Sequence, residues 1–115
     1  MVLILGGKGA GKRAYARSLG YREDQISTCP EDPVPVLCSL EELVRKDPEN
    51  ALSLVPSLLG KDVVICCEVG SGVIPISSQE RFFREQTGRL CVLLAKEAKT
   101  VVRIVAGIPQ ILKGE

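Results

Sequence analysis

The stretch Val2-Leu3-Ile4-Leu5-Gly6-Gly7-Lys8-Gly9-Ala10-Gly11-Lys12-Arg13 decides the fold of this chain. Its first four residues form a continuous apolar run, which is typical of a buried strand in a parallel sheet. The residues from Lys12 to Leu19 favour a helix, and Gly20 is a stop signal for it. A strand, a glycine-rich loop and a helix in this order predict the first β–α unit of an α/β domain.

The loop itself matches G-x-x-x-x-G-K, the first seven positions of a P-loop. In such a loop, backbone N–H groups, the positive end of the helix and the lysine all attract phosphate oxygens. We therefore expect Lys12 to bind phosphate and to serve catalysis. The full set of expected phosphate-binding residues is Gly6, Gly7, Lys8, Gly9, Ala10, Gly11, Lys12 and Arg13. The alternatives are a flexible turn for the whole loop and a solvated surface lysine for Lys8.

The eighth position departs from the pattern. A P-loop has Ser or Thr there to help hold Mg²⁺, whereas this chain has Arg13. Two unit charges about 4 Å apart interact by about 4 kcal/mol at an effective dielectric constant near 20, and a divalent ion doubles this repulsion. Arg13 therefore either turns to solvent or contacts a phosphate directly. We expect ATP or GTP to bind with a weakened dependence on Mg²⁺, and the sequence assigns no metal ligand.

The rest of the chain alternates strand and helix signals. Strands are expected at Gln25–Cys29, Asp62–Cys67 and Thr100–Val105, with Gly107-Ile108-Pro109 ending the last one. Helices are expected at Leu40–Lys46, capped by Ser39 with Glu42 at its third position, at Pro48–Leu59 and at Ser78–Ala98; Pro30–Pro35 and Glu68–Ser77 are expected to be irregular. This alternation predicts one domain over residues 1–115, a small three-layer α/β P-loop-type fold. Its mainly parallel sheet has about four strands, with helices on both faces.

The composition excludes several classes of function. A net charge of +1 on 115 residues argues against a dedicated nucleic-acid binder. The chain has no His, which removes His-based catalysis and His-containing metal sites. Its five Cys, at positions 29, 38, 66, 67 and 91, lack C-x-x-C spacing and are expected to be free thiols in a reducing compartment. No stretch resembles a signal peptide or a membrane span, so a cytoplasmic protein is expected, with no membrane partner.

A second motif, Glu68-Val69-Gly70-Ser71-Gly72, follows the strongest strand signal. Ligands of open α/β sheets bind at the carboxyl ends of the strands, so we expect Glu68 to share a crevice with the glycine-rich loop. Its carboxylate would order metal-bound water or accept a proton from an attacking hydroxyl. The alternatives are a carboxylate that caps nearby N–H groups and, for Gly70 and Gly72, turn geometry alone.

Residues 68–108 resemble the carboxy-terminal part of a family of bifunctional enzymes. The family carries E-V-G-x-G-[IV]-[IV]-P and then R-x-F-R-[DE]-x-x-G-R. This chain has Glu68-Val69-Gly70-Ser71-Gly72-Val73-Ile74-Pro75 and then Arg81-Phe82-Phe83-Arg84-Glu85-Gln86-Thr87-Gly88-Arg89, with the same spacing between the blocks. The family is that of adenosylcobinamide kinase/adenosylcobinamide-phosphate guanylyltransferase, of cobalamin biosynthesis. Together with Gly6 to Lys12 and Val105 to Pro109, the resemblance covers about half of the chain, at both ends.

The resemblance implies a nucleotide and a corrinoid as substrates, and a homo-oligomer with sites near subunit boundaries. The expected substrate-binding residues are Glu68, Gly70, Gly72, Arg81 and Arg84. For the arginines, the alternative is surface ion pairing, for example of Arg84 or Arg89 with Glu85. The family is longer, and its missing middle holds a histidine that becomes guanylylated. Because this chain has no His, guanylyl transfer through a histidine is excluded for these 115 residues.

Three functions stay open on the sequence. The first is a nucleotide-dependent kinase that phosphorylates a cobinamide-type alcohol, with Lys12 and Glu68 in its site. The second is a non-catalytic nucleotide-binding or regulatory subunit, favoured by Arg13 and by the missing histidine. The third is a structural remnant of the family whose loop binds nothing and whose helices serve only assembly.

Overall fold

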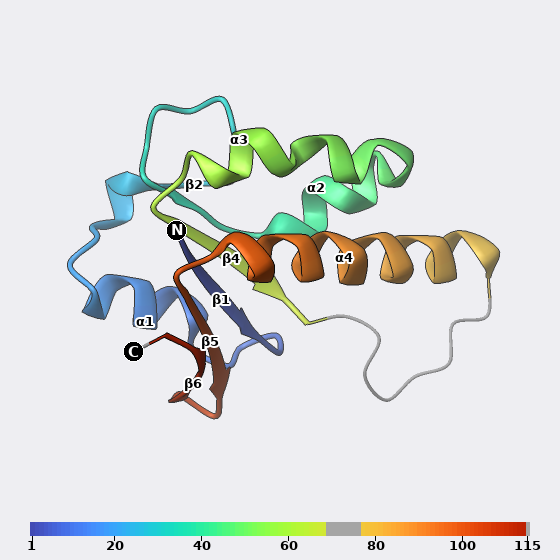
Figure 1. Ribbon diagram of the computed structural model, residues 1–115. Helices are drawn as coiled ribbons and strands as arrows, with labels where there is room; N and C mark the ends of the chain where they lie inside the picture. The colour runs from blue at the N-terminus through green and yellow to red at the C-terminus, as the bar shows by residue number, and fades with distance from the viewer. Residues whose placement is uncertain (69–76, 115) are drawn as a thin grey trace.

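The computed structural model describes residues 1–68 and 77–114, which form an α/β fold (Figure 1). Its strands are β1 (Val2–Gly6), β2 (Ile26–Ser27), β3 (Val36–Leu37), β4 (Val63–Cys67), β5 (Thr100–Val105) and β6 (Ile108–Lys113). Its α-helices are α1 (Lys12–Ser18), α2 (Leu40–Lys46), α3 (Val55–Leu59) and α4 (Ser78–Glu97), and its 3₁₀ segments are η1 (Glu23–Gln25) and η2 (Pro48–Leu54).

The six strands form one sheet in the order β2-β3-β4-β1-β5-β6. Strand β1 lies between β4 and β5 and pairs in parallel with both, so that Gly6 stands beside Cys67 on one side and Ile104 on the other. Only β6 is antiparallel, as the second strand of a hairpin with β5. The carboxyl ends of β1, β3 and β4 therefore lie at one edge of the sheet, where open α/β sheets bind ligands.

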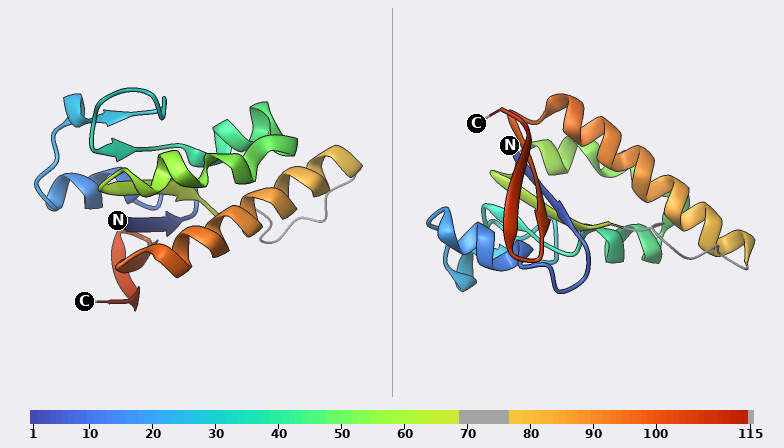
Figure 2. Two further views of the ribbon diagram at one scale, coloured as in Figure 1. Left: turned by 45° about the horizontal axis from the view of Figure 1, so that its top comes forward. Right: turned by 90° about the horizontal axis from the view of Figure 1, so that it is seen from below.

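Helices cover both faces of the sheet. Leu3 of β1 and Val64 of β4 pack with α2, α3 and α4 on one face, whereas Ile4 and Ile65 pack with α1 on the other. Figures 1 and 2 show α1 on one face of the sheet and α4 running alongside η2 and α3 on the opposite face. The alternation of side chains along each strand thus supplies two cores, which makes the fold a three-layer one.

The predicted fold class is confirmed, but the sheet has six strands where the sequence predicts about four. Strand β3 was missed because two residues give no periodic pattern, and it follows the irregular segment 30–35. Gly107-Ile108-Pro109 is predicted to end the strand Thr100–Val105, and no strand is predicted after it, whereas the structure has β6 there. Gly107 instead lies in a tight turn, and Pro109 is tolerated because β6 is an edge strand.

Two details of the helices differ from the predictions. Ser39 does not cap α2 with its side chain; it has a left-handed φ of 58°, and its carbonyl accepts the N–H of Glu42 at 3.0 Å. The chain must turn sharply here, because only Cys38 and Ser39 separate β3 from α2. The single helix predicted over Pro48–Leu59 is split into η2 and α3, with a non-helical backbone at Asn50.

Helix α4 is the longest, with 20 residues, and its bounds agree with the prediction. Ser77 caps its first turn by accepting the N–H of Glu80 at 3.0 Å. Gln86 anchors its middle by donating to the carbonyl of Pro48 at 2.9 Å. Within residues 1–68 and 77–114, no helix combines the length and the apolar character that a membrane crossing requires.

All five cysteines are free thiols. Cys38 and Cys66 are buried, whereas Cys29, Cys67 and Cys91 are half-buried. A hydrogen bond with Cys91 and burial raise the pKa of the Cys66 thiol, which therefore stays protonated. Cys66 and Cys67 face opposite sides of the sheet, as expected for neighbours in a strand: Cys66 belongs to the core under α4, and Cys67 does not.

Removal of the Leu90 side chain from the core should be costly. Leu90 on α4 is fully buried, so Leu90→Ala is expected to lower the free energy of unfolding by about 2–5 kcal/mol. Val92 on the same helix is 56% exposed, and Val92→Ala is expected to change the same quantity by less than about 0.5 kcal/mol. Urea unfolding followed by circular dichroism measures both, and similar losses would show that α4 is packed differently.

Candidate functional site

The glycine-rich loop between β1 and α1 is held at both ends by backbone hydrogen bonds. The carbonyl of Gly6 accepts the N–H of Glu68 at 2.8 Å, and the carbonyl of Ala10 accepts the N–H of Gly107 at 2.8 Å. A Cβ atom on Gly6 would lie 2.7 Å from the carbonyl oxygen of Ile104, so no other residue fits there. The loop is therefore fixed against β4 on one side and against the β5–β6 turn on the other.

Inside the loop, the chain folds back toward its own start. Gly11 has a φ of 99°, a conformation that glycine adopts far more readily than other residues, and α1 begins directly after it. The Nζ of Lys12 donates to the carbonyl of Gly7 at 2.7 Å. This bond folds the Lys12 side chain over the loop, so its positive charge lies among the residues predicted to bind phosphate.

A pocket of about 650 Å³ opens beside the loop, at the carboxyl edge of the sheet. Four basic and two acidic side chains line it, together with half-buried and buried apolar groups from β4 and α4. The lining residues are Lys8, Gly9, Gly11, Lys12, Arg13, Ala14, Cys38, Ser39, Glu41, Glu42, Arg45, Ile65, Cys67 and Phe83. Five of the eight residues predicted to bind phosphate thus share one cavity with the first turns of α2.

Arg13 lines this pocket, but its guanidinium forms an ion pair with Glu23. Its Nε lies 3.4 Å from a carboxylate oxygen of Glu23, and both side chains are about half exposed. The sequence leaves two orientations open for Arg13, toward solvent or toward a phosphate. The half-exposed pair with Glu23 agrees better with the orientation toward solvent. An exposed ion pair of this kind is weak and can be exchanged for another anion.

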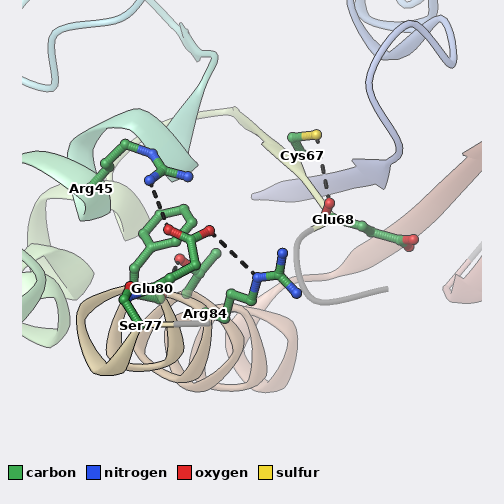
Figure 3. A network of polar contacts seen from close by, with 8 residues as sticks. Arg45, Cys67, Glu68, Ser77, Glu80 and Arg84 are labelled. Atoms are coloured by element: carbon green, nitrogen blue, oxygen red, sulfur yellow. Dashed lines mark hydrogen bonds and ion pairs between the residues drawn. The ribbon is translucent and has the colours of Figure 1, made fainter. Parts of the chain in front are cut away.

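Glu68 lies beside the start of the loop but faces away from the pocket. Its carboxylate accepts two hydrogen bonds from Arg103 of β5, from Nε at 2.8 Å and from a terminal nitrogen at 3.2 Å. Figure 3 shows the Glu68 side chain pointing away from Arg45 and Glu80. The structure thus brings the backbone of Glu68, but not its carboxylate, to the glycine-rich loop. Gly70 and Gly72 lie outside the described residues.

Sequence reasoning missed an acidic residue of the pocket, Glu41. Its Oε1 accepts the backbone N–H of Cys67, the last residue of β4, at 2.8 Å. In the sequence, Glu41 and Glu42 read as ordinary acidic residues of a first helical turn. Nothing local distinguishes Glu41, because its partner is 26 residues away in the chain.

Arg81 and Arg84 of α4, which the sequence predicts to bind substrate, do not line this pocket. Arg84 pairs with Glu80 one turn before it, at 3.6 Å, and Arg81 is exposed. Glu80 also pairs with Arg45 of α2, at 3.1 Å (Figure 3). Arg45 in turn stacks over the Phe83 ring, at 3.9 Å from its centroid. Arg45 therefore links the pocket wall to α4. The ion pair of Arg89 with Glu85, predicted as the alternative, is present at 2.5 Å.

The carboxylates that the structure describes near the loop are too few to hold a metal ion alone, but they suit a cation that is also bound by the phosphates of a nucleotide. Within residues 1–68 and 77–114, no three Cys, Asp or Glu side chains gather where they could hold a metal ion. Mg²⁺ is commonly bound by one or two carboxylates together with substrate phosphates and water. The carboxylate of Glu41 on the pocket wall fits this mode, whereas Arg13 at the usual hydroxyl position does not.

Comparison with known proteins gives two matches. Residues 31–112 match the family model described as cobinamide kinase/cobinamide phosphate guanyltransferase. Over 80 residues, the chain is 30% identical to the bifunctional adenosylcobalamin biosynthesis protein CobP of Pseudomonas aeruginosa. That alignment covers 70% of this chain and 46% of CobP, so the chain spans about half the length of this relative.

The network around Glu80 predicts a pH dependence of stability. A hydrogen bond from Arg45 and the charges of Arg45 and Arg84 hold the pKa of the Glu80 carboxyl below its ordinary value of 4.5. A lowered pKa stabilises the fold above the ordinary pKa, and this stabilisation is lost as the pH falls through the lowered pKa. Glu80→Gln should therefore lower the unfolding temperature at pH 7, with a difference that shrinks below pH 4.5. A difference that stays constant with pH would contradict this account.

Proposed function

The chain belongs to the cobinamide kinase/cobinamide phosphate guanyltransferase family, and from this membership we propose that it binds the phosphate groups of ATP or GTP on the loop between β1 and α1. Family membership supports a nucleotide-binding role in cobalamin biosynthesis. The observation that carries the proposal is the Lys12 side chain, folded over a glycine loop that opens into a pocket of about 650 Å³. The loop itself lies before the matched segment 31–112, so its geometry supports the proposal independently.

In its catalytic form, the proposed reaction is phosphoryl transfer to a cobinamide-type alcohol. The alcohol oxygen forms a bond to the terminal phosphorus, the bond from this phosphorus to the bridging oxygen of the leaving ADP or GDP breaks, and a base takes the hydroxyl proton. Lys12 would neutralise charge on the phosphates during this transfer. Guanylyl transfer through a histidine is not part of the proposal, because the 115 residues contain no His.

A second function, nucleotide binding without catalysis, is favoured by two contacts. Arg13 stands where a hydroxyl would help to hold Mg²⁺, and the predicted base, Glu68, is held by two hydrogen bonds from Arg103. The carboxylate oxygens of Glu68 are thus directed at Arg103 and not into the pocket. The family resemblance also implies a homo-oligomer, and this assembly is compatible with both proposed functions. The edge strand β6 supports it, since Ile108 and Leu112 are 68% and 54% exposed.

Loss of the Lys12 charge should weaken nucleotide binding. Lys12→Gln is expected to weaken the affinity for ATP or GTP at least about tenfold, because a hydrogen bond to a charged group typically contributes about 1.5–3 kcal/mol. Lys99→Gln is the matched control, since Lys99 precedes β5 at the opposite end of the strands. Calorimetric titration with each nucleotide, with and without Mg²⁺, measures this. Absence of binding at millimolar nucleotide would exclude both functions and leave a structural remnant.

Arg13 should contribute to binding without metal if it moves from Glu23 to a phosphate. Arg13→Ala is then expected to weaken nucleotide binding in EDTA by about 1–3 kcal/mol. Arg13→Ser should make the affinity depend more strongly on Mg²⁺, because it restores the hydroxyl of a P-loop. Equal affinities of the unmodified chain and both variants in EDTA would mean that Arg13 stays paired with Glu23.

A further inference from the structure

Glu41 is fixed at the strand end nearest to the glycine-rich loop. Strand β4 is paired with β1, and Cys67 stands opposite Gly6, the residue from which the loop departs. The Glu41 side chain reaches this position from α2 and accepts the Cys67 N–H at 2.8 Å. The last N–H of β4 is therefore satisfied by a carboxylate that also lines the pocket beside the loop.

Two carboxylates line the pocket, Glu41 and Glu42, and Glu41 is the one that a hydrogen bond fixes at this strand end. The carboxylate of Glu68 is held by both nitrogens of Arg103 and lies outside the pocket. Among the ion pairs of residues 1–68 and 77–114, none involves Glu41. Its carboxylate is thus not held in an ion pair with any Lys or Arg of these residues.

The charge of Glu41 has opposite effects on bare and on metal-bound nucleotide. Lys8 and Lys12 draw a polyphosphate into the same pocket, where Glu41 repels it. A divalent cation on the phosphates reverses the sign, because carboxylate and phosphate oxygens can then share it. A carboxylate held rigidly by a backbone N–H loses little freedom in doing so, which favours this use over a merely solvated role.

We propose that Glu41, the pocket carboxylate fixed at the end of β4, makes nucleotide binding depend on a divalent cation. The proposal rests on the nucleotide binding proposed above and assigns to Glu41 the metal-directed role that the sequence suggests for Glu68. Glu41 acts here as a binding residue, and the proposal concerns affinity, not the rate of any reaction.

The test compares nucleotide affinity in EDTA and in Mg²⁺ for the unmodified chain, Glu41→Gln and Glu68→Gln. Glu41→Gln should bind ATP or GTP at least about threefold more tightly in EDTA, since a repulsive charge is removed. Its gain in affinity on adding Mg²⁺ should be at least about tenfold smaller than that of the unmodified chain. Glu68→Gln should leave this gain unchanged, as should Glu85→Gln, which removes an exposed carboxylate of α4.

The fold should survive Glu41→Gln, because glutamine keeps an oxygen that can accept the Cys67 N–H. Measuring the unfolding temperature of this variant checks that it is folded. If Glu41→Gln does not fold, Glu41→Asp keeps the charge and should bind nucleotide in EDTA no more tightly than the unmodified chain. Tighter binding of that variant would overturn the proposal.

The remaining outcomes separate this proposal from the one on which it rests. If the unmodified chain binds neither nucleotide, the proposed function fails and the role of Glu41 fails with it. If the chain binds nucleotide through Lys12 but Glu41→Gln keeps the full gain from Mg²⁺, the role of Glu41 is wrong and nucleotide binding stands. If the increase in nucleotide affinity on adding Mg²⁺ is lost in Glu68→Gln and kept in Glu41→Gln, the metal-directed residue is Glu68 and the proposal is wrong.

Discussion

The end of β1 at Gly6 is the constraint on which the rest of this structure depends. The strand lies between two parallel neighbours, so the chain must leave the sheet from its middle. It can do so only because Gly6 has no Cβ, which would lie 2.7 Å from the Ile104 carbonyl. The Gly6 carbonyl then accepts the Glu68 N–H, which ties the loop to β4. The pocket exists because the loop, β4 and the start of α2 are held around this point.

Polar contacts near the pocket position side chains more than they stabilise the fold. The pair of Glu68 with Arg103 and the pairs of Glu80 with Arg45 and Arg84 are partly exposed, and such pairs typically contribute about 0–1 kcal/mol each. The two apolar cores on either face of the sheet provide the stability. What the ion pairs decide is direction: Arg103 turns Glu68 away from the pocket, and Glu80 holds Arg45 over Phe83 at its wall.

Most of the fold could be predicted from the sequence, because long elements carry a pattern in every residue. Helix α4 and strand β5 were predicted within a residue of their bounds. The elements that the sequence did not predict are either very short or depend on the strands and helices beside them. Two residues of β3 have no periodicity, β6 is a strand only because β5 offers an edge, and Ser39 takes a left-handed turn because β3 and α2 leave it no room.

The sequence by itself determined the β1–loop–α1 unit, since apolar runs, glycines and a lysine at fixed spacing act on their immediate neighbours. It also brought the backbone of Glu68 to the start of the loop, because the ends of adjacent parallel strands coincide. Only the tertiary structure decided which carboxylates line the pocket. Glu41 meets Cys67 across 26 residues and Arg103 meets Glu68 across 35, and contacts at such separations leave no local pattern in the chain. The side chain of a strand-end residue is directed by what packs beside it, and this is set by the assembled sheet.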